Sequence, residues 1–559
     1  MTDFRRTLLW VVFATSLFLI WDAWNKHNGQ PSLFSPAPRP VAAASAPGGT
    51  APLGGVPQAS TVPGVAGAVP AAPAAAAVAT AGEKVVVTTD VVQATFDSIG
   101  GSLVRLELLN YQDSNDPTKK VVLFEQDAKR QYMAQTGLTL QAGAQALNHL
   151  TPMVVAPGER TLATGAAQLS VRFESPVLDG RQLVKTYTLK RGDYAVAVKH
   201  EVVNQGTTPF SPQLYLQLVR DGNAPEGESA FYSTFTGPAL YTEANKYQKV
   251  DFGDIEKGKA SHDTSAQDGW IGMVQHYFAS AWLVPVTGPR EFRTNKVPGA
   301  NNLYAIAMVL PLGDIAPGTT RAHEATLFAG PQEEKKLAAL APGLEYVKDY
   351  GFLTPLSKPL FWLLDELHKI IGNWGWAIVA LVVLLKIAFY WLNASAYKSM
   401  AKMKAVNPKV MEMRERLKDK PQQMQQEMMR IYREEKVNPL GGCLPILVQM
   451  PFFIALYWVL LSSVEMRNAP WIGWITDLSV KDPWFILPVL MTLSSLAQVA
   501  LGAKPPDPLQ AKMMWIMPLA FGVMFFFFPA GLVLYWLTNN LLSIAQQWYI
   551  NKKLGVPVT

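Results

Sequence analysis

The stretch WGWAIVALVVLLKIAFYWL, from Trp374 to Leu392, is a nearly unbroken apolar run that contains one charge, Lys386. A helix needs about 20 such residues to cross a bilayer, so this length predicts a transmembrane span with Lys386 close to its middle. A charge at that depth costs about 2.5–3.5 kcal/mol and usually faces a bundle interior or a wet cavity. The alternative is that Lys386 extends its ammonium along its own stem to the nearer membrane interface.

The composition agrees with a membrane protein that has a substantial water-soluble part. Hydrophobic residues make up 49% of the 559 residues and charged residues only 16%, and the length allows several domains. The net charge of +6 falls largely in one segment between apolar spans, where a positive-inside bias explains it without nucleic acid. The single Cys443 excludes an intramolecular disulfide and a metal site built from cysteines.

Two segments precede the first folded domain. Residues 1–27 place Arg5 and Arg6 before the apolar stretch Leu8 to Trp21, which predicts an uncleaved transmembrane anchor with a cytoplasmic N-terminus. A cleaved signal peptide is the alternative. Residues 28–83 consist mainly of Pro, Ala, Gly and Ser, a composition that cannot bury enough apolar surface to fold, and are therefore predicted to be a linker.

Residues 84–331 predict a large all-β sandwich outside the cytoplasm. Short runs of alternating polarity are separated by turn residues, and a hairpin is clearest between Gln182 and Asn204. This pattern predicts roughly fifteen antiparallel strands. The histidines are scattered, and neither a G-x-S-x-G nor an H-E-x-x-H motif occurs. We therefore predict no catalytic residue, metal site or cofactor, and no enzymatic activity.

Helices are predicted from residue 332 onward. Residues 332–373 contain a short helix, Glu333 to Ala341, and an amphipathic helix, Pro359 to Ile370, whose pattern suits a membrane interface. Residues 374–550 predict an all-α bundle of five core transmembrane helices. After the first span, the others are Leu444 to Val464, Pro483 to Leu501, Lys512 to Phe528 and Ala530 to Ile550. The tail, 551–559, with two lysines is expected in the cytoplasm.

A basic segment, residues 394–440, separates the first two core spans. Its excess of cations predicts a cytoplasmic location, and two helices, Asn407 to Lys418 and Pro421 to Lys436, predict a helical hairpin. Its many methionines either pack in the seam of the hairpin or offer a flexible apolar surface to partners. The candidate binding residues of the hairpin are Met411, Arg414, Met424, Met428 and Arg433.

Polar residues inside the spans suggest a cavity. Asn539, Ser543 and Gln546 recur at i, i+4 and i+7, so they share one helix face. Together with Lys386 and Gln449 they are expected to line a wet cavity, unless they only join helices by hydrogen bonds. One lysine without intramembrane carboxylates is a poor proton relay. This favours a polypeptide substrate over the alternative function, a small-solute channel or transporter with an extracytoplasmic binding domain.

Four stretches resemble the YidC/Oxa/Alb family in its Gram-negative form: GNWGWAIVALVVLLK, YKSMAKMKAVNPKVMEMRERL, EKVNPLGGCLPILVQMPFFIALY and FPAGLVLYWLTNNLLSIAQQ. The resemblance covers Pro359 to about Tyr549. It implies a membrane protein insertase and chaperone of the inner membrane that receives hydrophobic segments from the ribosome or the Sec translocon and releases them into lipid without ATP. It also implies that the β-sandwich is periplasmic and mutarotase-like.

The resemblance further implies a cationic groove that holds the polar segment of the substrate. The arginine of this groove corresponds to Lys386, which keeps the charge but loses the bidentate fork, and a groove threonine corresponds to Val382. Gln449 and Tyr535 match positions of the family, and Ser543 stands where the family often has threonine. The predicted groove comprises Lys386, Gln449, Tyr535, Trp536, Asn539 and Ser543.

Overall fold

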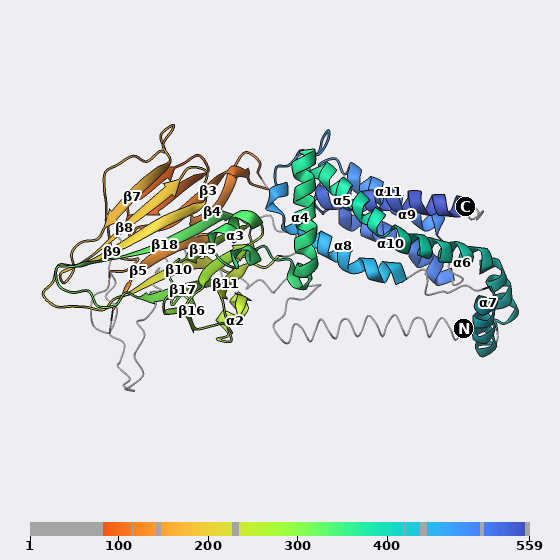
Figure 1. Ribbon diagram of the computed structural model, residues 1–559, viewed down its shortest axis with the longest axis horizontal. Coiled ribbons are helices and arrows are strands. Elements are labelled where there is room, and N and C mark those ends of the chain that lie inside the picture. The colour runs from red at the N-terminus through yellow and green to blue at the C-terminus, as the bar shows by residue number, and fades with distance from the viewer. Residues whose placement is uncertain are drawn as a thin grey trace. The chain divides into compact units, whose positions relative to one another are not determined.

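A computed structural model describes residues 82–114, 116–140, 147–225, 234–418, 420–435, 444–502 and 508–553. The predicted anchor, almost all of the predicted linker, and residues 436–440 and 554–559 lie outside these ranges. The chain divides into two compact units, and the main division falls between Lys348 and Asp349. The first unit is built from strands and the second from helices (Figure 1).

The β unit contains two sheets of nine strands each. The first has the order β1 (Lys84–Thr88), β2 (Val92–Asp97), β3 (Ser102–Gln112), β4 (Lys120–Gln126), β5 (Gln131–Thr139), β10 (Gln213–Asp221), β17 (Leu303–Pro311), β16 (Arg290–Lys296) and β13 (Ser265–Ala266). The second has the order β12 (Lys246–Lys249), β11 (Gly237–Thr242), β14 (Trp270–Gln275), β15 (Phe278–Leu283), β18 (Thr320–Pro331), β9 (Ala195–Asn204), β8 (Arg181–Lys190), β7 (Gln168–Glu174) and β6 (Val154–Val155). A short helix, α2 (Phe252–Glu256), follows β12.

More strands are present than the roughly fifteen expected from the polarity pattern. The strands β6 and β13 have two residues each, too few to show an alternating pattern. The hairpin β8–β9 lies where the sequence predicts one, and its antiparallel register pairs Lys185 with His200. On the inner face of the second sheet the same row continues to His323, which pairs with His200.

The second unit is helical. α3 (Glu334–Leu340) and a short 3-10 turn (Leu344–Val347) precede the boundary and belong to the β unit. After a second 3-10 turn (Gly351–Leu353), the helices of the second unit are α4 (Thr354–Ile371), α5 (Trp374–Ala388), α6 (Tyr390–Arg416), α7 (Pro421–Glu434), α8 (Leu444–Ser462), α9 (Ile486–Leu501), α10 (Pro508–Phe525) and α11 (Ala530–Lys553). α11 packs against α5, α6, α8 and α9, whereas α10 packs chiefly on α9. α11, which has 24 residues, therefore forms the centre of this unit.

The first predicted span differs from the expectation of one straight helix. α5 ends at Ala388, and α6 leaves it at an angle of 68°. Phe389 lies between the two helices with φ −91° and ψ 9°. Among the described helices none alone has the length and apolar character needed to cross a membrane, whereas α5 and α6 meet both criteria as a bent pair. Lys386 consequently lies in the last turn of α5 rather than at mid-span.

The amphipathic helix α4 begins five residues earlier than predicted. Leu360, Phe361 and Leu364 are buried, and α4 packs against α5 and α8. Trp362 and Ile370, two further apolar residues of this predicted amphipathic helix, are 59% and 83% exposed. The predicted apolar face is therefore divided: one side packs on neighbouring helices and the other remains on the surface.

The predicted hairpin also differs in its first helix. Instead of beginning at Asn407, α6 runs without interruption from Tyr390 and passes through Pro408. The second helix, α7, begins at Pro421 as the sequence predicts. Val406, Val410 and Met413 of α6 form a buried cluster against which side chains of α7, including Met424 and Met428, pack. This packing outweighs the missing backbone donor of the proline, which ordinarily breaks a helix.

A loop between α8 and α9 is tied to the start of α5. The Asn373 side chain donates to the carbonyls of Pro470 and Trp471, each at 3.1 Å. Gly375 lies under the Trp471 ring, where a Cβ atom would come within 2.2 Å of Cδ1. At the other end of the loop, Asp482 is buried and accepts from the backbone amide of Leu487 at 2.7 Å. These contacts fix the loop against the helical unit.

Candidate functional site

Lys386 is held at the centre of the helical unit by a hydrogen-bonded chain. Its Nζ donates to the Ser543 hydroxyl at 2.7 Å, and that hydroxyl donates to the backbone carbonyl of Asn539 at 2.7 Å. α5 supplies the lysine and α11 supplies both oxygens. Within the described residues Lys386 forms no ion pair with a carboxylate. The cation is thus turned inward between two helices, as the cavity interpretation predicts, and neutral oxygens are its partners.

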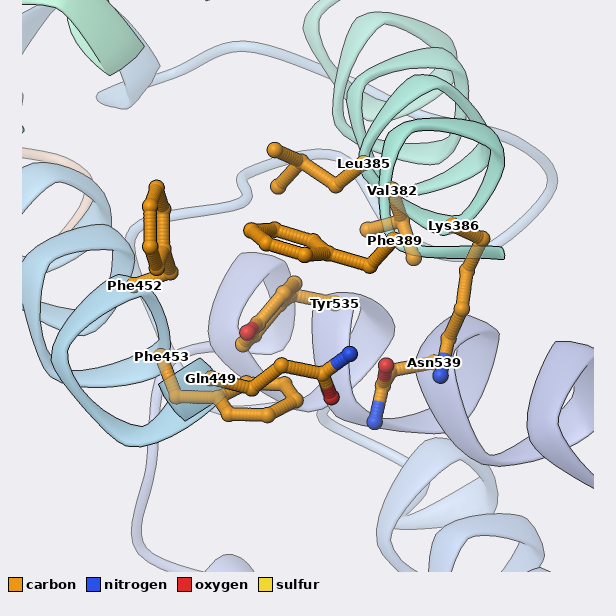
Figure 2. A pocket seen from close by; sticks show the side chains of 9 residues that line it. All are labelled: Val382, Leu385, Lys386, Phe389, Gln449, Phe452, Phe453, Tyr535 and Asn539. Atoms are coloured by element: carbon orange, nitrogen blue, oxygen red, sulfur yellow. The ribbon is translucent and has the colours of Figure 1, made fainter. Parts of the chain in front are cut away.

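A pocket opens beside this lysine, between α5, α8 and α11. Figure 2 shows Lys386 reaching from α5 and Gln449 from α8 toward Asn539 on α11. The cavity volume is about 30 Å³, which is enough for about one or two water molecules. The pocket is lined by Val382, Leu385, Lys386, Phe389, Gln449, Phe452, Phe453, Tyr535 and Asn539. A polypeptide segment could enter only if the helices moved apart.

Four of the six predicted groove residues line this pocket, and a fifth, Ser543, binds Lys386. Trp536 does not line it: its ring contacts Phe525 of α10 edge-on, with ring centroids 4.9 Å apart. Successive residues of a helix are about 100° apart around its axis. Because Tyr535 faces the pocket, its neighbour Trp536 must face elsewhere, and the sequence analysis placed both on one surface.

Aromatic residues of the pocket were missed by the sequence analysis. Phe389 and Phe452 meet edge-on with ring centroids 4.9 Å apart, and Phe453 contacts Tyr535 at 6.1 Å. The available signal was spacing, because Phe453 follows Gln449 by one helical turn. The position of Phe389 could not be inferred in this way, since it depends on the bend between α5 and α6.

Other polar residues of the predicted spans form hydrogen bonds between helices and do not line the pocket. Asn540 of α11 donates to the hydroxyls of Ser494 and Ser495 on α9, at 3.1 and 2.8 Å. Gln547 donates to the Leu501 carbonyl at 3.1 Å. These bonds join α9 to α11 away from Lys386. For this set, hydrogen bonding between helices, the alternative to a cavity, is the correct interpretation.

The candidate residues of the hairpin also divide into two groups. Met424 and Met428 pack against the buried cluster of α6, so they belong to the seam of the hairpin. Met411 is 45% exposed, and Arg433 is exposed on α7. Arg414 lies between these extremes, half-buried on α6. The residues of this hairpin that are available to a partner are therefore fewer than the sequence suggested.

Family models and individual relatives place the chain in the same protein family. A family model described as "YidC periplasmic domain" matches residues 84–363, and one described as "60Kd inner membrane protein" matches residues 366–556. The chain is 56% identical over 554 residues to the membrane protein insertase YidC of Cupriavidus necator, covering 99% of this chain and 98% of that protein. The chain belongs to the YidC family of membrane protein insertases. The corresponding protein of Janthinobacterium sp. is 50% identical and covers 99% of this chain and 100% of its own length.

Solved structures are less similar than these sequences. A crystal structure of an active YidC insertase is 17% identical and matches with a TM-score of 0.38, covering 83% of this chain and 92% of that chain. A galactose mutarotase related enzyme of Lactobacillus acidophilus is 8% identical with a TM-score of 0.30. The match covers 44% of this chain and 97% of that chain.

Membership of the YidC family confirms the resemblance found in the four sequence stretches. The protein is an insertase of the inner membrane, its β unit corresponds to the periplasmic domain of the family, and nascent membrane proteins are its substrates.

Proposed function

We propose that the pocket beside Lys386 is the contracted form of a cationic groove that holds the polar segment of a substrate during insertion. The observation that carries this proposal is the inward position of Lys386, bonded to Ser543 and adjacent to Gln449 and Asn539. A polar segment in the bilayer core loses its hydrogen bonds to water. A lysine and two amides replace some of them, while the hydrophobic helix that follows partitions into lipid at about 25 cal/mol per Å².

The proposed groove acts mainly through charge. Lys386 carries the only formal charge among the described residues that line the pocket. A compact ammonium attracts carboxylates and carbonyl oxygens but lacks the planar fork of arginine. Electrostatic attraction to an acidic or polar segment is therefore sufficient, and bidentate recognition of a carboxylate is not required.

The orientation and partners complete the proposal. Both termini and the α6–α7 hairpin lie in the cytoplasm, as the positive-inside distribution favours, and residues 1–27 anchor the chain. Exposed hairpin residues such as Met411 and Arg433 receive nascent chains from the ribosome. Insertion occurs alone or with the Sec translocon, and the apolar surface of the helices contacts membrane lipid.

The test is protease protection of a small single-span substrate offered to proteoliposomes that contain the full chain. We expect Lys386→Ala to lower the insertion rate and Lys386→Arg to retain it, because the charge is kept. Equal insertion by all three proteins would contradict the groove. Flux of a small solute without insertion would instead favour a transporter.

A further inference from the structure

A second polar contact joins the helices around the pocket. Gln449 of α8 donates its Nε2 hydrogen to Oδ1 of Asn393 at 2.7 Å. Asn393 lies on α6, one turn beyond Phe389. It is not among the predicted site residues. The same two helical segments also meet through the rings of Phe389 and Phe452.

Asn393 is an unusual residue for its position. It is 5% exposed, and its Nδ2 is buried without a hydrogen-bond partner among the described residues. A buried donor without a partner destabilises a fold, and an apolar side chain of the same shape would avoid that loss. Packing alone therefore does not account for an amide here, and such a group requires a functional explanation.

The contact determines how Gln449 faces the pocket. An amide offers donors at one end and an acceptor at the other. Because Nε2 is engaged by Asn393, the Oε1 atom remains as an acceptor at the pocket, and Gln449 makes no other hydrogen bond within the described residues. Lys386 offers a donor from the opposite side. The pocket thus presents a donor and an acceptor, the two groups needed to bind the C=O and N–H of a polypeptide backbone.

We propose that Asn393 is a positioning residue of the insertion groove: it holds the side chain of Gln449 so that Oε1 accepts a backbone N–H of the polar segment in transit. The inference rests on the groove function proposed above. Without Asn393, Gln449 rotates freely and must be ordered each time a segment enters. The free energy needed to immobilise one such side chain is large enough to slow insertion about two- to tenfold.

A double-mutant cycle tests this role in proteoliposomes that contain the full chain. Asn393→Leu should lower the insertion rate about two- to tenfold without lowering the thermal midpoint of the purified protein, because leucine removes the unpaired buried amide. In the Gln449→Leu background the same substitution should cause no further loss, because Asn393 acts through Gln449. Ser395→Leu, at an exposed position of the same helix, is the matched control and should insert like the wild type. Asn393→Ala, which adds no volume, replaces the leucine variant in the cycle if leucine impairs folding.

Two results would overturn the proposal. One is insertion by Asn393→Leu at the wild-type rate. The other is an equal further loss in the Gln449→Leu background, which would show that Asn393 acts independently of Gln449. Measuring Lys386→Ala in parallel separates the two hypotheses: if only that variant is slow, the groove stands and the role of Asn393 fails, and if neither is slow, the groove itself fails.

Discussion

Lys185 is a buried lysine of the β unit whose hydrogen-bond partners are neutral oxygens. Its Nζ donates to the carbonyls of Gly100 and Thr136 at 2.6 and 2.7 Å, and burial lowers its pKa to about 7. His200, the next residue in the cross-strand row, has its pKa lowered well below the usual value by burial and by the charges of Lys185 and His323. His323 itself lies near Arg290 and Glu324, and burial also lowers its pKa.

This row makes the stability of the β unit depend on pH. Each group binds more protons in the unfolded chain than in the folded one, so stability rises with pH. For Lys185 the rise extends from about pH 7 to its ordinary value of 10.5, and for His200 it lies below 6.5. Lowering the pH from 7.5 to 5.5 should therefore reduce the free energy of unfolding, because His200 takes up a proton over this range in the unfolded chain but not in the folded one.

Hydrogen exchange of residues 181–204 in the full chain, measured at pH 7.5 and 5.5 and corrected for intrinsic rates, would detect this loss. Nε2 of His200 is hydrogen-bonded to the Thr136 hydroxyl at 3.0 Å. His200→Gln, which can replace this bond but does not titrate, should reduce the difference in exchange between the two pH values. An unchanged pH dependence in that variant would show that other groups dominate.

At the same scale, residue chemistry identified much of the site but not its details. Lys386 was found because a charge interrupts an apolar run, and Gln449, Asn539 and Ser543 because polar groups in such spans need partners. Asn393 was missed because it follows the bend at Phe389, where helical spacing no longer predicts which residues share a face. Trp536 was included because a motif match carries no information on the direction of a side chain.

Among the elements, the α6–α7 hairpin shows how packing overrides local signals. Pro408 predicts the start of a helix, yet α6 passes through it because Val406, Val410 and Met413 pack on α7. The start of the second helix, α7, at Pro421 was predicted correctly, because no packing across this position favours a continuous helix. Strands with clear alternation were likewise predictable, whereas two-residue strands were not.

The seam of the hairpin provides an element-level prediction. Val410 is 1% exposed and the adjacent Met411 is 45% exposed. Val410→Asp buries a charge in an apolar cluster and should destabilise the hairpin by at least about 2 kcal/mol, which increases hydrogen exchange across residues 400–434. Met411→Asp is the matched control and should leave exchange nearly unchanged. Equal effects of both would show that α6 and α7 do not pack as described.

For the whole molecule, the division into two compact units predicts separable functions. Every residue that lines the pocket belongs to the unit that begins at Asp349. Deleting residues 84–330 should therefore leave most insertion activity in proteoliposomes, and Lys386→Ala should lower what remains. Loss of all insertion by the deletion, with normal amounts of protein in the membrane, would show that the β unit takes part in the reaction.

Sequence alone could establish the order of these parts but not all of their limits. Composition marks the change from strands to helices, because alternation of period two gives way to long apolar runs. The unit boundary at Lys348 lies within the segment predicted as connecting helices, since contacts between distant residues, which a single sequence does not show, decide where each unit ends.

The attachment of α5 to Trp471 gives this helix a fulcrum. Gly375 and Asn373 fix one end, while the other end stops at the bend at Phe389 and is tied to α11 by the bond from Lys386 to Ser543. Lys386 lies eleven residues from Gly375, about 16 Å along the axis. A tilt of about 10° at the fulcrum would move the lysine by roughly 3 Å over that arm. The helix would then work as a lever: once the bond from Lys386 to Ser543 is released, the pocket would widen at that end while the loop keeps the opposite end in place.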